Sequence, residues 1–284
     1  MAPKLGILAG RGDLPATLIE ACQASGRDFF LIGFTGETDA ELLRPHPHAW
    51  VSLAGVGSLF QNLHKAGCHE VVLAGAVTRP SFSNMRPDWR GMKLLPKVIT
   101  AARAGDDALM NLLISELEIE GFTVVGAHDL VPDLVASAGP LGGLLPDDKQ
   151  SSDIARGLDV LLALGPYDVG QAVIVSNGQV MGIEAAEGTA RLIARCGELQ
   201  AERDKNAVTA GNKGVLVKIA KPGQERRADL PTIGRETVKQ IADAGLGGIA
   251  VEAGGSLVLQ PEQIGPDADK AGIFVFGVTV EHEG

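Results

Sequence analysis

The sequence predicts an α/β protein in two parts: an N-terminal doubly wound domain and a distinct C-terminal mixed α+β domain. Throughout residues 1–130, short apolar runs alternate with amphipathic stretches, which is the pattern of a parallel sheet with helical crossovers. Two of these runs end in Ala-Gly, at residues 9–10 and 74–75. From residue 166 onward, hairpin signals mix with helices. We therefore expect an N-terminal domain at 1–130, a linker and connecting helix at 131–165, and a C-terminal catalytic domain at 166–284.

The chain opens with a strand, a glycine loop and a helix. An apolar run at 4–9 precedes Gly10-Arg11-Gly12-Asp13-Leu14-Pro15, and a helical pattern over 16–24 closes at Gly26. A helix N-terminus after such a loop can receive a phosphate. Pro15 replaces the third glycine of a dinucleotide fingerprint, and the second strand, 29–34, has no acid well placed for a ribose. The loop is thus typical of nucleotide or phosphate binding, and NAD is disfavoured.

The strand and helix pattern then repeats. Strands are expected at 50–53, 70–74 and 122–125, with helices at 58–66 and 108–118 and a loop running into a helix over 87–104. The loop after residue 74 should lie beside the loop after residue 9, because ligands bind beyond the carboxyl ends of parallel strands. Thr78 and Arg79 favour an anion there. Asp106 is expected to cap the following helix, and a paired-carboxylate metal site with Asp107 is the alternative.

Composition excludes several classes of protein. The chain has 25 basic and 35 acidic residues, a net charge of −10 and 4% aromatic residues, which argues against nucleic-acid binding. Its three cysteines form no CxxC pair, so neither a zinc site nor a disulfide framework is expected. We expect buried thiols in a reducing compartment instead. No apolar run reaches the ~20 residues needed to span a bilayer. These features predict a cytoplasmic protein.

The second half is expected to combine a hairpin, helices and apolar strands. Residues 130–153 are rich in Pro, Gly and Asp and are predicted to form a linker, followed by a helix at 154–164. An Asn177-Gly178 turn predicts a hairpin of 172–175 with 180–185. A helix should start near Thr189, and another should span 235–244. Further strands are expected at 214–217, 248–252, 256–259 and 272–278.

The loop from Lys218 to Gly234, KIAKPGQERRADLPTIG, carries the densest chemistry in the chain. Lys218 and Lys221 are cations that can hold phosphate oxygens, and Asp229 can take a metal ion or position water. A charged surface loop is the alternative. The two prolines and the glycine of this segment favour a fixed path, and with it the functional interpretation.

Several motifs together resemble one known family. AGRGDLP at 9–15, AGAVTRP at 74–80, AGDDAL at 104–109 and KPGQERRADLPTIG at 221–234 are similar to the UDP-2,3-diacylglucosamine pyrophosphatases of the LpxI type. EGT at 187–189 and VEAGG at 251–255 belong to the same pattern. The resemblance covers essentially the whole chain. One departure is Ala190, because members of the family often have an acid directly after EGT.

The resemblance implies a fold and a reaction. The fold is a Rossmann-like N-terminal domain and a distinct C-terminal domain, with the lipid substrate held between them. The reaction is Mg²⁺-dependent hydrolysis of UDP-2,3-diacylglucosamine to UMP and 2,3-diacylglucosamine 1-phosphate (lipid X) in lipid A biosynthesis. Its partners would be this lipid-nucleotide substrate and, transiently, the cytoplasmic face of the inner membrane, with no nucleic acid. From the sequence alone, no basic amphipathic helix is expected to anchor it there. A homodimer through the apolar C-terminal strands is left open.

The resemblance also implies site residues. The key acid of the family corresponds to Asp229, which is expected to be catalytic and to bind the metal. Substrate contacts are expected at Gly10, Gly12, Leu14, Ala76, Gly105, Asp106, Gln171, Glu184, Gly188, Thr189, Lys218, Lys221, Gln224 and Thr232. Six apolar residues could line an acyl chamber, although core packing is the favoured explanation for them: Met92, Leu94, Leu95, Leu141, Leu144 and Leu145.

Two other functions remain open at this point. A non-catalytic carrier for a nucleotide-sugar or lipid would use the same pocket, and Asp229 would then affect affinity alone. A nicotinamide-dependent sugar dehydrogenase is suggested by the opening fold, but the incomplete glycine fingerprint argues against it.

Overall fold

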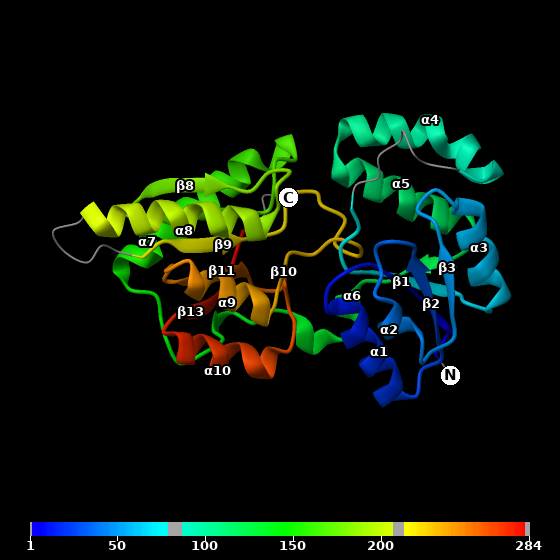
Figure 1. The fold of residues 1–284 in the computed structure, drawn as a ribbon, viewed down its shortest axis with the longest axis horizontal. Helices are drawn as coiled ribbons and strands as arrows, with labels where there is room; N and C mark the ends of the chain where they lie inside the picture. The colour runs from blue at the N-terminus through cyan, green and yellow to red at the C-terminus, as the bar shows by residue number, and fades with distance from the viewer. Residues whose placement is uncertain (1, 79–86, 207–212, 282–284) are drawn as a thin grey trace. The chain divides into compact units, whose positions relative to one another are not determined.

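The computed structural model describes residues 2–78, 87–206 and 213–281 (Figure 1). The chain divides into two compact units. The first unit comprises Met1–Pro132 together with Glu225–Asp229, and the second comprises Asp133–Gln224 together with Leu230–Gly284. The chain therefore returns to the first unit for five residues in the middle of the second. Arg79, which we expected at an anion site, lies outside the described residues.

A five-stranded parallel sheet forms the centre of the first unit. Its strand order is β3-β2-β1-β4-β5, and every neighbouring pair is parallel. The strands are β1 (Leu5–Ala9), β2 (Phe29–Phe34), β3 (His48–Val51), β4 (Glu70–Ala74) and β5 (Thr123–Val124). The predictions for β2 and β4 are confirmed residue for residue, while β3 begins two residues earlier than expected. β1 is buried along its whole length, as a central strand covered on both faces must be.

Six helices accompany this sheet in the described part of the unit: α1 (Leu14–Ser25), α2 (Ala40–Leu43), α3 (Val56–Lys65), α4 (Trp89–Ala104), α5 (Asp106–Ile119) and α6 (Ala127–Leu130). α1 starts with Pro15 in its first turn and stops at Gly26, whose φ of 65° ends the helix. We expected Asp106 to cap α5, and this prediction is wrong. Gly105, with φ of 135°, holds that position, and Asp106 lies inside the first turn, where its charge suits the helix dipole.

Apolar side chains on one face of this sheet pack against α3 and α5. Leu8, Ile32 and Val71 from three strands contact the cluster that includes Leu63 of α3 and Leu117 of α5. Burying each such side chain contributes about 1.5–3 kcal/mol. α4 contacts α5 and α3 and forms an additional layer outside them, as Figure 1 shows.

The second unit is built on a mixed six-stranded sheet with the order β6-β13-β11-β9-β7-β8. The three central strands are mutually parallel, and β7, β8 and β6 run antiparallel to their neighbours. The strands are β6 (Gly139–Pro140), β7 (Ala172–Ser176), β8 (Gln179–Ile183), β9 (Val215–Lys218), β11 (Gly248–Glu252) and β13 (Phe274–Val278). A separate parallel pair joins β10 (Thr232–Ile233) to β12 (Leu257–Val258). β11 pairs with β13 along its whole length and β6 pairs with it at Phe276 and Gly277, and the homodimer stays a prediction.

The predicted Asn-Gly hairpin is confirmed. Asn177 and Gly178 join β7 to β8 with φ values of 53° and 72°, the left-handed pair that this tight turn requires. The Asp153 carboxylate accepts both turn amides, at 3.0 Å from Asn177 and 2.6 Å from Gly178. Only 1% of Asp153 is exposed, so this carboxylate is a buried support for the turn.

Of residues 131–165, expected to link the domains, all but the first two belong to the second unit. They form the short turn at Pro132–Leu134, the strand β6, and the helix α7 (Asp148–Leu164), which packs on β7 and β9. α7 begins six residues before the predicted start because Asp147 and Gln150 cap it reciprocally, at 2.8 and 2.9 Å. The remaining helices are the turn Gly165–Tyr167, α8 (Thr189–Asn206), α9 (Arg235–Asp243) and α10 (Pro261–Ala271). The sequence did not predict α10.

The three cysteines are free and buried, as expected. Burial raises the pKa of each thiol, of Cys22, Cys68 and Cys196 alike, which keeps them protonated and unreactive at neutral pH. In the part of the chain that the structure describes, no helix combines the length and the apolar character that crossing a membrane requires.

Candidate active site

A buried lysine at the end of the central strand β9 organises the predicted site in the second unit. Only 9% of Lys218 is exposed. Its ammonium donates to the Thr189 hydroxyl oxygen at 3.1 Å and to the Thr232 carbonyl oxygen at 3.2 Å. A buried ammonium is costly unless it is hydrogen-bonded. Its two acceptors come from the start of α8 and from the short strand β10, so these hydrogen bonds hold both elements to the end of β9.

Glu184 extends this network. One carboxylate oxygen accepts the Thr189 hydroxyl at 2.6 Å, and the other accepts the backbone N–H of Gln171 at 3.2 Å. Five residues that we predicted separately from the sequence (Gln171, Glu184, Thr189, Lys218 and Thr232) therefore lie in one hydrogen-bonded group. Gly188, with φ of 80°, turns the chain into α8 directly before Thr189.

Lys221 begins a tight turn that Gln224 closes. The Gln224 side-chain oxygen accepts the Lys221 N–H at 2.8 Å, and the Gln224 N–H donates to the Lys221 carbonyl at 3.1 Å. Both side chains are buried. The Lys221 ammonium is paired with Asp168, so its charge is compensated within the unit, a contact that the sequence did not predict.

A second buried carboxylate supports the same loop from below. Glu252, at the end of β11, is 2% exposed and accepts the N–H of Ala220 at 2.9 Å. It lies against Gly255, where a Cβ would come within 2.1 Å of its carboxyl carbon. This contact gives a physical reason for Gly255, the second glycine of VEAGG, because any larger residue there would displace Glu252.

The segment that carries Asp229 belongs to the first unit. Ala228 packs against the hydrophobic cluster that contains Leu8 and Leu117. Asp229 is half-buried, and its N–H donates to the Glu225 carbonyl at 3.1 Å, which closes one turn of chain. Asp229 is thus placed by a turn of fixed geometry, whereas Lys218 and Lys221 lie in the second unit.

Arg227 fastens that turn. Its guanidinium binds both oxygens of Glu225, at 3.0 and 2.7 Å, and donates to Glu118 of α5 at 2.7 Å. These hydrogen bonds raise the pKa of Arg227, and the Arg227 guanidinium holds the pKa of Glu225 below its usual value. Arg227 therefore acts in this structure as a fastening of the Asp229 segment.

In the first unit, the loops after β1 and β4 lie directly against each other, as their shared Ala-Gly endings predicted. Gly10 donates its N–H to Ala74 at 2.7 Å, and Arg11 and Ala76 exchange backbone hydrogen bonds at 2.8 and 3.0 Å. A Cβ on Gly10 would lie 2.5 Å from the Ala76 carbonyl oxygen, so the close approach depends on glycine. Gly12 and Leu14 follow at the start of α1, while Gly105 and Asp106 stand at the junction of α4 and α5.

Glu37, three residues after β2, also lies at this sheet edge, and its carboxylate is engaged by neighbouring loops. Glu37 accepts from the N–H and the hydroxyl of Thr78, at 2.8 and 3.1 Å, and its carboxylate lies 3.4 Å from Arg11. In this structure its carboxylate ties the three loops together.

The carboxylates do not form a dedicated metal cage. Among the described residues, no group of three or more His, Cys, Asp or Glu side chains is placed to hold an ion. Glu184 and Glu252 are occupied by protein donors, and Asp168 is occupied by Lys221. A divalent ion would therefore have to draw most of its oxygens from a ligand and from water, which is the arrangement that Mg²⁺ commonly adopts with phosphates.

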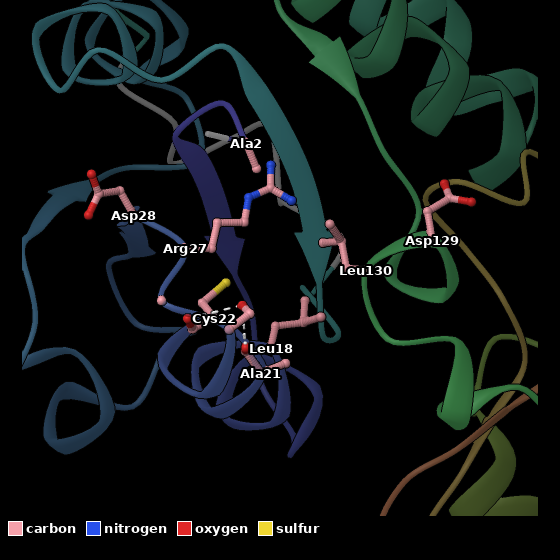
Figure 2. A pocket seen from close by; sticks show the side chains of 10 residues that line it. Ala2, Leu18, Ala21, Cys22, Arg27, Asp28, Asp129 and Leu130 are labelled. Atoms are coloured by element: carbon pink, nitrogen blue, oxygen red, sulfur yellow. Dashed lines mark hydrogen bonds between the residues drawn. The ribbon is translucent and has the colours of Figure 1, made fainter.

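A cavity of about 410 Å³ in the first unit lies away from all the predicted residues (Figure 2). Leu18, Cys22 and Leu130 line it, and the Arg27 side chain extends between Ala2 and Leu130. Arg27 is already engaged, because it donates to the Pro3 carbonyl at 3.0 and 3.2 Å and pairs with Glu70.

Sequence reasoning missed Asp168, Glu252 and Glu118 as supports of the site. A buried lysine needs a compensating acid, so the existence of a partner for Lys221 could have been inferred, but not its position 53 residues away. Of the residues expected to line an acyl chamber or a core, Met92, Leu144 and Leu145 are exposed, so core packing is the wrong explanation for these three.

Comparison with known proteins gives two matches to family models. Residues 4–134 match the LpxI N-terminal domain, and residues 137–276 match the LpxI C-terminal domain. A relative from Caulobacter vibrioides, described as UDP-2,3-diacylglucosamine pyrophosphatase LpxI, is 42% identical over 276 residues, which cover 97% of each chain. A solved structure, N5-carboxyaminoimidazole synthase from Aspergillus clavatus, is 11% identical, covers 66% of this chain and 42% of its own, and has a TM-score of 0.25. That score is too low to support a structural argument.

Proposed function

Because the chain belongs to the LpxI family, we propose that it hydrolyses the diphosphate of UDP-2,3-diacylglucosamine to UMP and 2,3-diacylglucosamine 1-phosphate. Water would add its oxygen to one phosphorus, and the bridging oxygen would leave with the other phosphate. The observation that carries the proposal is the 42% identity to a UDP-2,3-diacylglucosamine pyrophosphatase over nearly the full length of both chains. The enzyme is thus a hydrolase acting on a phosphorus anhydride.

The buried cation network supports a phosphorylated substrate. Lys218 is buried, and its ammonium donates to a hydroxyl and to a carbonyl oxygen. An anion that reaches this ammonium would gain a strong charge-assisted hydrogen bond without the entropic cost of ordering a flexible lysine. We propose that Lys218 binds a phosphate oxygen, with Thr189 at the first turn of α8 beside it. Lys221 would share its charge with Asp168 and the substrate.

Mg²⁺ fits this donor set as an ion shared with the substrate. We propose that Asp229 holds it, while diphosphate oxygens and water supply the other ligands. When bound, the ion would neutralise charge on the diphosphate as water approaches. Asp229 suits this role because its turn is fastened at Glu225 and Arg227 and its side chain is only half-buried.

The first unit would supply a nucleotide-type site of Rossmann-like character. Its strand order places the loops after β1 and β4 side by side, at the edge where ligands bind in open parallel sheets. We propose that Gly10, Gly12, Leu14 and Ala76 contact the substrate there, and that Gly105 and Asp106 contact it at the start of α5. Glu37 would preserve the shape of this edge. We also propose that the enzyme meets its diacylated substrate through transient contact with the cytoplasmic face of the inner membrane.

The test is release of UMP from detergent-dispersed UDP-2,3-diacylglucosamine, with and without Mg²⁺, for the wild type and Asp229→Asn. We expect metal-dependent turnover and a loss of at least ~100-fold in the variant, because a group that binds the metal acts on the transition state. Circular dichroism and the urea midpoint should match between the two proteins, which would show that the fold is unchanged.

A different result would redirect the assignment. Tight binding of the substrate with no UMP released, with or without metal, would replace the hydrolase by the carrier. Turnover that persists unchanged in Asp229→Asn would remove Asp229 from the mechanism. A rise in NADH fluorescence on addition of the protein would support the alternative assignment as a nicotinamide-dependent dehydrogenase.

A further inference from the structure

The helix α4 exposes apolar and basic side chains together, and the function proposed above does not account for this surface. α4 packs on α5 and α3, and only Gly91 and Ala102 are buried along its 16 residues. Trp89 is 71% exposed and Met92 is 57% exposed. Burying a tryptophan would normally be favourable, so a protein gains little from holding one in water unless another surface covers it.

The charge of α4 is opposite to that of the whole chain. It carries Arg90, Lys93, Lys97 and Arg103 and no acidic residue, whereas the full chain has a net charge of −10. Two of these cations hold the helix in place, because Lys97 pairs with Glu116 of the neighbouring α5 at 2.9 Å and Arg90 pairs with Glu120, which caps the end of α5, at 2.6 Å. Lys93 and Arg103 are exposed on the outer side.

Five exposed residues of α4 form one stripe. Trp89, Met92, Pro96, Thr100 and Arg103 recur at intervals of three and four, which places them on a single helical face. Lys93 adjoins the stripe, and its ammonium lies 5.2 Å from the centre of the Trp89 ring. This cation–π contact keeps the indole and the charge side by side at the surface.

A bilayer surface with anionic headgroups matches this combination. Indole rings settle at the level of the headgroups, an unbranched apolar side chain such as Met92 reaches the acyl boundary, and Lys and Arg attract anionic lipid. An aqueous protein partner would have to supply both an apolar groove and acids in register along the stripe. The lipid surface needs no such register.

We propose that the outer face of α4, defined by Trp89, Met92, Lys93, Pro96, Thr100 and Arg103, is a docking surface for anionic phospholipid bilayers. The proposed function gives this surface its purpose, since a diacyl substrate has to be collected from a membrane. The inference rests on the proposed function in this respect alone. Binding is weak and reversible, because one short stripe with two outward cations gives a membrane affinity far below that of a stable anchor. It weakens as salt is raised, because the attraction is partly electrostatic.

The chain provides its own reporter for this contact. It has two tryptophans, Trp50 and Trp89, so Trp50→Phe leaves Trp89 as the only indole. With vesicles that contain phosphatidylglycerol, we expect the Trp89 emission to shift to shorter wavelength and to be quenched by lipids brominated near the headgroup. With pure phosphatidylcholine vesicles, we expect little change.

Charge reversal tests the surface itself. Lys93→Glu with Arg103→Glu should lower the affinity for phosphatidylglycerol vesicles at least about tenfold in a sedimentation assay. The matched control is Lys239→Glu with Lys270→Glu, which makes the same charge change at two exposed sites of the second unit and should keep most of the binding. Turnover of detergent-dispersed substrate should be unchanged in both variants, which separates this inference from the proposed reaction.

Three outcomes would overturn the inference: no binding of the wild type to anionic vesicles, equal losses in the two charge-reversed variants, or binding without any change at Trp89. Each of them leaves the hydrolase proposal standing if UMP is still released. Failure of UMP release with intact vesicle binding would reject the reaction and keep the docking surface.

Discussion

Arg227 donates to Glu118 across 2.7 Å, and this contact joins residues that lie 109 positions apart. It links the segment Glu225–Asp229 to the helix α5, within the same compact unit. The same guanidinium donates two further hydrogen bonds to Glu225. The side chains of Glu118, Glu225 and Arg227 thus stabilise the turn that precedes Asp229. The position of the proposed catalytic acid therefore depends on an ion pair two residues away from it.

Removing the Glu118 carboxylate tests this dependence. Glu118→Gln should lower kcat by about tenfold, because small displacements of a catalytic group are costly. It should change the free energy of unfolding by no more than about 1 kcal/mol, because both partners are partly exposed. Steady-state kinetics and urea unfolding measure the two effects.

The control is Glu116→Gln on the same helix, where the carboxylate pairs with Lys97. It should reproduce the small stability change and leave kcat as in the wild type. If both variants lose activity equally, the effect comes from α5 in general, and the fastening of the Asp229 segment is not its cause.

Lys218 gives a prediction about affinity. Lys218→Met removes a buried ammonium, and we expect KM to rise about 10- to 100-fold, which corresponds to the loss of one charge-assisted hydrogen bond to phosphate. Stability should fall by about 1–3 kcal/mol, because the substitution leaves the Thr189 hydroxyl and the Thr232 carbonyl without their donor. An unchanged KM would place the phosphate elsewhere, and comparison with Lys218→Arg would show how far charge alone restores binding.

The sequence predicts those parts of this protein that local signals determine. The turn at Asn177-Gly178 and the helix α1, with Pro15 in its first turn and Gly26 as its C-cap, are examples, since each is encoded within a few residues. The network around Lys218 was recognised only as separate motif residues. Its geometry depends on the pairing of β9 with β7 and β11, which no local pattern encodes.

The features that the sequence did not predict are of two kinds. Contacts between distant residues, such as Asp168 with Lys221, require the fold itself to be known. A helix that contains proline was also missed, because α10 has Pro261 in its first turn and Pro266 inside it. Tertiary packing of the apolar face offsets the proline in such helices, and composition alone does not reveal that.

The carboxylate of Glu225 predicts how the turn responds to acid. Its pKa is lowered from a reference of 4.5, chiefly by hydrogen bonds from Arg227. The unfolded chain thus binds this proton more readily than the folded one, so the contribution to stability is complete above pH 4.5 and is lost as the pH falls through the lower folded pKa. Arg227 stays charged throughout this range. Titration of the Glu225 carboxyl carbon by NMR should show the lowered pKa in the wild type and its return toward 4.5 in Arg227→Gln.

Glu252 predicts a loss of stability with a specific local readout. Glu252→Ala removes the acceptor of the buried Ala220 N–H, and an unsatisfied buried donor costs about 1–3 kcal/mol. Glu252→Gln keeps an acceptor oxygen of the same reach, so it should retain most of the stability. The two variants should also differ in amide exchange at Ala220, which should become much faster in Glu252→Ala and change little in Glu252→Gln. Because Lys218 and Lys221 flank this amide in the chain, a released Ala220 should disorder both lysines and raise KM in Glu252→Ala. An equal effect of the two substitutions would mean that the negative charge of Glu252, rather than its hydrogen bond, holds the loop.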